Sequence, residues 1–198
     1  MEEKKYILTE ETKELFGRTL YRIEAARDFS DVKKGDKGGW IESEKNLSHE
    51  GNAWVSGNAE VYGDAWVSGN AKVSGNAEVY GYSWVSGNAD VSGDAKVYGN
   101  ADVSDDAKVS GNAEVCGDAW VYGDAKIESE RDYIVFKNWW SSGRHFTWTR
   151  SNNMWKVGCF YGTGEELIKK AYADSPESGR EYERVVRYVE SILKEDNN

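Results

Sequence analysis

The sequence has little proline, cysteine and histidine, and it lacks any long apolar run. Pro176 is its only proline and aromatic residues make up 13% of it, a composition that excludes a disordered chain. No window approaches the ~18 apolar residues that a membrane helix needs, and the first residues carry no apolar export signal. We therefore expect no membrane association, a cytoplasmic location, and Cys116 and Cys159 as reduced thiols.

Negative charge is concentrated in the middle of the chain. The formal net charge is −10, and residues 53–126 alone carry eleven Asp and Glu against four Lys. The flanking segments are nearly balanced. Because a surface of this sign repels phosphate backbones and anionic headgroups, nucleic acid is an unfavourable partner for this segment.

A six-residue repeat accounts for this segment. An aliphatic residue recurs every six positions, thirteen times, from Val55 to Ile127. Ala stands two residues before it, with Ser83 as the exception. Gly stands two residues after each Val, followed by Asn or Asp, and the departures are Asp105 and Tyr82. Each hexad predicts a short strand with an inward Val, and a Gly-Asn or Gly-Asp corner.

Outward aromatic residues give the number of hexads in one coil. Tyr recurs at 62, 80 and 98, and Trp at 66, 84 and 120, spacings of eighteen or its double. Three hexads therefore close one triangular coil, and residues eighteen apart stack at roughly 4.8 Å. We predict a mainly β fold, a parallel β-helix of about four to five coils. Asp64, Asp94, Asp106, Asp118 and Asp124 are interpreted as corner residues and not as a calcium ladder.

Two modules flank the repeat at 53–130. Residues 1–52 are predicted to cap the open end with short strands at 6–8 and 20–23 and a partial coil from Ile41 and Leu47, reset by two extra residues around His49. Residues 131–198 predict a small α+β module. It has three strands, a helix opened by the Thr163–Glu166 capping box, and a second helix from Pro176.

The hexads, such as Val-Tyr-Gly-Asp-Ala-Trp at 61–66, resemble the left-handed parallel β-helix of hexapeptide-repeat proteins. The stretch from Arg27 to Ser48 is similar to the opening of a bacterial and phage hexapeptide-repeat family without established activity. The 131–198 module resembles a phage-type tail module. These likenesses imply a left-handed helix, trimers or dimers, and the cytoplasm of a bacterial host. Fold alone does not imply function.

Many proteins of this fold are acyltransferases, and some are zinc carbonic anhydrases, so both activities are alternatives. They use histidines at coil edges as base or zinc ligands. This chain has only His49 and His145, and no loop interrupts the thirteen hexads. We therefore expect no catalytic residue, no metal site and no cofactor, with acyl transfer as the enzymatic alternative.

Two sets of residues are candidate binding sites. On the rod, outward aromatic rings could dock a partner or a second copy, or pack within the molecule. In the 131–198 module, Arg and aromatic side chains could hold a small planar anion, although these rings could equally form a core. The rod candidates are Trp54, Trp66, Trp84, Trp120, Tyr62, Tyr80 and Tyr98, and those of the module are Trp140, Arg144, His145, Trp148 and Arg150.

The favoured hypothesis is a non-catalytic scaffold that binds a protein partner, or itself, through the Trp-bearing side of the rod or through the 131–198 module. A phage inhibitor, acting as an acidic decoy of a nucleic-acid backbone or by sequestering a small ligand, is an alternative. Salt-dependent capture of a basic host protein would favour the decoy. Acetyl-coenzyme A binding would favour the acyltransferase.

Overall fold

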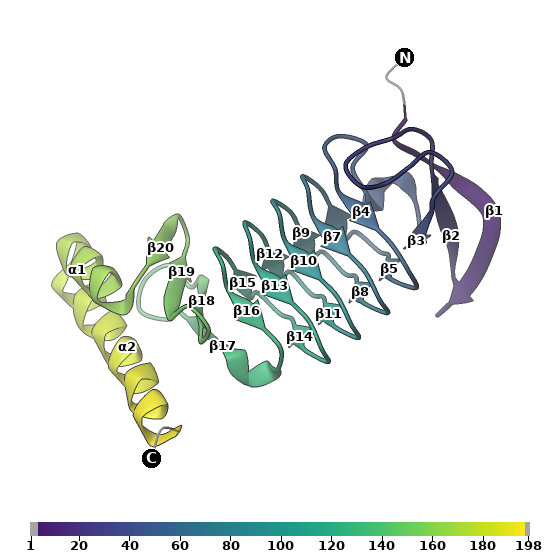
Figure 1. Cartoon of the computed structure of the whole chain (residues 1–198). Helices are drawn as coiled ribbons and strands as arrows, with labels where there is room; N and C mark the ends of the chain where they lie inside the picture. Colours follow the sequence, from purple (N-terminus) through teal and green to yellow (C-terminus); the bar gives the residue numbers. More distant parts are fainter. Residues whose placement is uncertain (1–3, 197–198) are drawn as a thin grey trace.

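The computed structural model describes residues 4–196 and consists mainly of β-strands (Figure 1). Three parts follow one another: N-terminal antiparallel strands, a rod of stacked coils, and a small sheet with two helices at the other end. The predicted parallel β-helix is confirmed. No helix among residues 4–196 is long and apolar enough to cross a membrane.

The N-terminal strands extend one side of the rod. Strands β1 (Tyr6–Leu15) and β2 (Arg18–Ala25) form a hairpin whose tip, Phe16 and Gly17, has positive φ. Strand β3 (Lys37–Ile41) pairs antiparallel with β2 and parallel with β5, so the hairpin continues a sheet of the rod. Both hairpin strands are longer than predicted, because cross-strand pairing carries them beyond the coil, where their side chains lack the apolar pattern.

Thirteen two-residue strands form the three sides of the rod. Each consists of an outward residue followed by the inward Val, or by Ile127 in the last one. Strands three apart pair in parallel, so the eighteen-residue period is confirmed. In chain order the strands are β4 (Trp54–Val55), β5 (Glu60–Val61), β6 (Trp66–Val67), β7 (Lys72–Val73), β8 (Glu78–Val79), β9 (Trp84–Val85), β10 (Asp90–Val91), β11 (Lys96–Val97), β12 (Asp102–Val103), β13 (Lys108–Val109), β14 (Glu114–Val115), β15 (Trp120–Val121) and β16 (Lys126–Ile127).

The first coil begins at Ile41, as the sequence predicts, which brings the rod to about five coils. Ile41 pairs with Val61 and Leu47 with Val67, so partners lie twenty residues apart here and eighteen apart further along. The two additional residues fall between Leu47 and Val55, in the segment that holds His49.

The inward Val and Ala side chains form the core of the rod and are almost completely buried. Ser83, in an Ala position, is also buried, and its hydroxyl donates to the carbonyls of Tyr80 (2.9 Å) and Val97 (3.2 Å). The corner glycines have positive φ, and Asp105 takes the same conformation (φ 58°). The corners therefore need residues that tolerate the left-handed region.

Asn side chains form ladders along the corners. The amide of Asn52 donates to Asn70 (3.0 Å), Asn70 to Asn88 (2.9 Å) and Asn88 to Asp106 (2.9 Å). An Asn both accepts from one neighbour and donates to the next, whereas an ionised Asp only accepts. Asp therefore ends this ladder, and a shorter one ends at Asp94 in the same way.

The C-terminal module closes the end of the rod. After a 3-10 turn η2 (Glu130–Asp132), its sheet contains β17 (Tyr133–Lys137), β18 (His145–Thr149), β19 (Met154–Val157) and β20 (Phe160–Gly162). The prediction of three strands was wrong by one, because a turn with Gly158 at φ 56° divides the segment 154–161. The Tyr133 hydroxyl accepts from the Cys116 backbone (3.3 Å) and donates to the Glu114 carbonyl (3.1 Å), which pairs backbone groups at the rod end.

Two helices cover this sheet. Helix α1 (Gly164–Asp174) opens at the Thr163 capping box, and α2 (Pro176–Asp196) begins at the proline, both as predicted. They enclose a second core separate from that of the rod. Its buried residues are Phe146, Trp148, Trp155, Leu167, Ile168, Ala171, Tyr182, Val186 and Val189.

Candidate binding face

One side of the rod carries three of its tryptophans in a single column. Strands β6, β9, β12 and β15 are neighbours in one sheet, which places Trp66, Trp84, Asp102 and Trp120 on successive coils. We call this column the Trp column. Trp54 lies on the adjoining sheet, with β4, as the repeat predicts.

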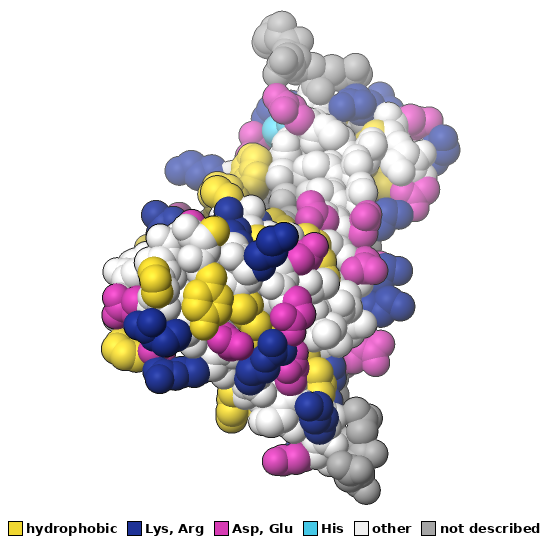
Figure 2. Space-filling view, turned by 90° about the vertical axis from the view of Figure 1, so that its left-hand side faces the viewer, with side chains coloured by type: hydrophobic (Ala, Val, Ile, Leu, Met, Phe, Trp, Pro, Cys, Tyr) yellow, Lys and Arg dark blue, Asp and Glu magenta, His cyan; other side chains and the backbone are white. Residues whose placement is uncertain are grey.

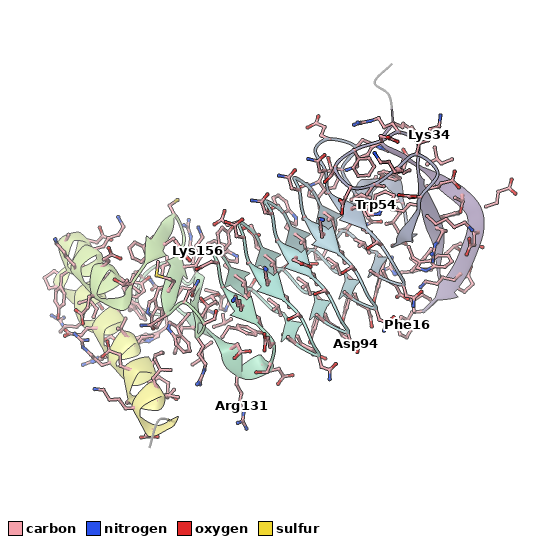
Figure 3. The ribbon with its side chains drawn as sticks, in the orientation of Figure 1. Phe16, Lys34, Trp54, Asp94, Arg131 and Lys156 are labelled. Carbon is pink, nitrogen blue, oxygen red and sulfur yellow. The ribbon has the colours of Figure 1, made fainter. Side chains whose placement is uncertain are left out.

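The flanking modules bury one of the four rod tryptophans, Trp54, and contact a second, the half-buried Trp120. Trp54 lies at the N-terminal end of the rod (Figure 3). It is only 8% exposed because Phe29 of the N-terminal loop packs edge-on against it, with ring centroids 5.4 Å apart. The backbone N–H of Trp120 donates to Thr147 Oγ1 (2.8 Å), and Lys156 Nζ lies 5.9 Å from its ring centroid. Packing within the molecule therefore accounts for Trp54 and for part of the Trp120 surface.

The middle of the Trp column is open. Trp84 is 58% exposed, and Tyr82, two residues earlier at the corner, is 66% exposed. Trp66 and Trp84 line a shallow hollow of about 400 Å³ together with Lys45, Gly63 and Asp64. We call Tyr82 and Trp84, together with the half-buried Trp66, the exposed aromatic surface. Tyr82 occupies an Asn position without disturbing the coil, since its N–H still donates to the Gly99 carbonyl (2.8 Å).

The predicted tyrosine ladder is present, and it is internally satisfied. Tyr62, Tyr80 and Tyr98 stack with ring centroids 5.0 Å apart and planes within 2°. The Tyr62 hydroxyl donates to Glu78 and that of Tyr98 to Glu114. Burial raises the pKa of Tyr62. These rings contact each other along the rod, so the stack contributes mainly to the rod's own packing.

A second hollow, of about 470 Å³, lies where the C-terminal module meets the last coils. It is lined by Asn100, Asp118, Trp120, Arg144 and His145, and we call it the junction hollow. His145 Nδ1 lies 2.9 Å from Asp118 Oδ2, and the Asn100 amide donates to Asp118 Oδ1 (3.0 Å). The structure thus brings together Trp120 from the rod set and Arg144 and His145 from the module set.

The sequence did not single out Asn100 and Asp118 as site residues. Both stand at corner positions, where Asn and Asp are expected for conformational reasons. Their spacing of eighteen residues, at the corner beside Trp120, is the sequence signal that could have placed them together near that ring. That the 131–198 module would pack there could not be read from the repeat.

The other module candidates do not join this hollow. Trp148 is 1% exposed and its indole N–H donates to Asn153 (2.9 Å), while Trp140 packs edge-on against Tyr182 with centroids 4.9 Å apart. Core packing, the alternative considered for these rings, therefore describes both. Arg150 Nε donates to the Arg131 carbonyl (3.2 Å), beside the 3-10 turn η2.

His49 is enclosed within the N-terminal region. Its ring stacks on Tyr6 with centroids 4.2 Å apart, and Nδ1 accepts from the Lys5 backbone N–H (3.3 Å). Nε2 is buried, and burial lowers the pKa of His49. Nδ1 is therefore engaged by the backbone, and Nε2 lies below the surface of a half-buried side chain. Among residues 4–196, no group of three or more His, Cys, Asp or Glu side chains is placed to hold a metal ion.

The charged groups at the C-terminal end of the Trp column are partly buried. Tyr122 donates to Asp102 Oδ2 (2.5 Å), and Lys156 Nζ lies 4.1 Å from the Tyr122 ring centroid. Burial raises the pKa of Asp102.

At the C-terminal end of the molecule, acidic, basic and hydrophobic side chains are interspersed on the visible surface (Figure 2). The C-terminal module therefore presents no large patch of one sign on that face.

Comparison with known proteins gives one short likeness. No family model matches the chain. It is 42% identical over 55 residues to a protein of Escherichia coli (strain K12) named "Uncharacterized acetyltransferase YdcK". The match covers 27% of this chain and 17% of that relative, so the chain spans less than a fifth of the protein that it resembles.

Proposed function

We propose that this chain is a non-catalytic binding protein that engages a cationic protein partner through the exposed aromatic surface. The observation that carries the proposal is the contrast within one set of rings: the N-terminal module buries Trp54 and the C-terminal module leaves Trp120 half-buried, whereas Trp84 and Tyr82 remain 58% and 66% exposed. Large rings at the centre of an interface supply much of its binding energy, and Trp and Tyr are enriched there.

The rod suits such a role because its backbone is fixed. The N–H of Trp84 donates to the Ala101 carbonyl and that of Trp66 to the Ser83 carbonyl, so the strands below both rings are tied to the next coil. A rigid platform loses little conformational entropy on binding. The net charge of −7 over residues 53–126 favours a partner with Lys or Arg around an apolar centre. We also propose the phage-related setting and the cytoplasmic location that the family resemblance implies.

The test combines Trp84→Ala with Tyr82→Asn, where Asn is the residue that the repeat itself uses at that corner. A control pair, Asp106→Asn with Lys108→Ala, changes the same two repeat positions on another side of the rod. We expect the first pair to weaken capture of the partner from host lysate at least about tenfold, and the control to leave it unchanged. Capture should weaken only modestly as salt rises, because the rings supply most of the binding energy, whereas a steep salt dependence would favour the acidic decoy.

Equal capture by both double variants would contradict the proposal. Loss of an oligomer in the Trp84 variant, measured as mass in solution without any heterologous partner, would assign the surface to self-association instead. Circular dichroism of each variant checks that the rod remains folded.

Acyl transfer is the second candidate, supported by the likeness to a protein named as an acetyltransferase and by the His145–Asp118 pair. A carboxylate on Nδ1 orients an imidazole so that Nε2 can accept a proton, as a general base requires. His145, and not the enclosed His49, would then be the base. This candidate would be favoured if acetyl-coenzyme A turnover is lost in His145→Ala and retained in His49→Gln. Calorimetry that detects no binding of acetyl-coenzyme A to the chain would exclude it.

A further inference from the structure

The junction hollow combines an aromatic wall with a guanidinium and an imidazole. Trp120 is half-buried and supplies the flat surface; on the C-terminal module His145 begins β18, and Arg144 directly precedes it. Among residues 4–196, no acidic side chain pairs with the Arg144 guanidinium, which is exposed at the rim. An unpaired guanidinium beside an indole is suited to a planar group that bears negative charge.

The one carboxylate in the hollow is already engaged. Asp118 faces His145 Nδ1 through one oxygen (2.9 Å) and accepts from Asn100 through the other (3.0 Å). Its charge is therefore directed at groups of the protein. With Nδ1 held by Asp118, Nε2 is the nitrogen of His145 left for a ligand.

We propose that the junction hollow binds a small aromatic anion: a flat ring that stacks on Trp120 and bears a carboxylate or phosphate group held by Arg144. The site lies at the C-terminal end of the Trp column, away from the exposed aromatic surface, and it does not depend on the proposed protein partner. Its volume of about 470 Å³ lies within the usual range for small-ligand pockets, about 300–1,000 Å³.

Calorimetry on the full chain tests the site with two probes, 2-naphthoate and adenosine 5′-monophosphate, which separate a carboxylate from a phosphate ligand. Saturable one-to-one binding of at least one probe is expected. Inorganic phosphate alone should bind far more weakly, because it lacks the ring.

Three variants locate the binding. Arg144→Gln should weaken it about tenfold or more, because a hydrogen bond to a charged group is lost. Asp118→Asn keeps a corner residue that the repeat uses, removes a negative charge, and should leave binding equal or tighter. Arg180→Gln, on helix α2, is the matched control and should bind as the parent does.

Two results would overturn the proposal: no saturable binding of either probe, or unchanged affinity in Arg144→Gln. Equal binding of the neutral compound 2-naphthol would reduce the hollow to an apolar cleft. Because Trp84 and Tyr82 are intact in all three variants, these outcomes are independent of partner capture.

Discussion

Two glycines in equivalent corners offer a test of how tightly the coils are stacked. Gly75 and Gly117 both have positive φ, 71° and 65°. A Cβ on Gly75 would lie 2.8 Å from the carbonyl oxygen and 3.0 Å from the nitrogen of Gly93 in the next coil, whereas a Cβ on Gly117 meets no atom within 4 Å. Alanine at either position therefore has the same backbone penalty, but only Gly75→Ala also collides with the neighbouring coil.

The magnitudes follow from these two contributions. A left-handed conformation costs an L-residue roughly 1–2 kcal/mol, so Gly117→Ala should lower the free energy of unfolding by about that amount. Displacing a packed backbone adds about 1–3 kcal/mol, as overpacking does in a core. Gly75→Ala should therefore be destabilised by roughly 2–5 kcal/mol in total.

Urea unfolding followed by far-ultraviolet circular dichroism measures both variants against the parent chain. The informative quantity is the difference between the two glycines, since the backbone penalty cancels. If Gly117→Ala lost as much stability as Gly75→Ala, the coils would not be stacked as closely as the structure shows, and the reasoning would be refuted.

Two other predictions concern buried charge and the corner ladders. Lys5 is fully buried, and burial together with the charge of Arg27 lowers its pKa from 10.5 to about 8. Between these two pH values the unfolded chain binds more protons than the folded chain, so the free energy of unfolding should rise from pH 8 to 9.5. This rise should diminish in Lys5→Met. Asn76 accepts from Asn58 and donates to Asp94 (2.9 Å). Asn76→Asp removes this donor, so it should lower the free energy of unfolding by about 1 kcal/mol, and by less at high salt. Asp94→Asn should be nearly neutral in the same urea-unfolding assay.

The rod could be predicted almost residue by residue because its information is local and repeated. Each Val fixes an inward position, each Gly-Asn pair fixes a corner, and the outward Tyr and Trp residues reveal the eighteen-residue period. Even the two additional residues of the first coil follow from the distance between Leu47 and Val55. Because the repeat is strictly periodic, only one register places every inward Val in the core of the rod.

The modules at the two ends were harder to predict. The division of residues 154–161 into two strands depends on Gly158, which is indistinguishable in sequence from a glycine inside a strand. The burial of Trp54 and Trp148 depends on which segment packs over each ring, and this is a long-range contact without a local signal. For the same reason the pairing of Asp118 with His145 emerged only in three dimensions.

Cysteine cross-linking tests the stacking of residues eighteen apart most directly. In a background of Cys116→Ser and Cys159→Ser, Asn70→Cys with Asn88→Cys should form a disulfide under mild oxidation, because these side chains are neighbours on adjacent coils (2.9 Å between Nδ2 and Oδ1). Asn70→Cys with Asp106→Cys, two coils apart, should form none, because about 9.6 Å exceeds the span of a disulfide. Cross-linking of the second pair but not the first would contradict the eighteen-residue coil, and with it the Trp column.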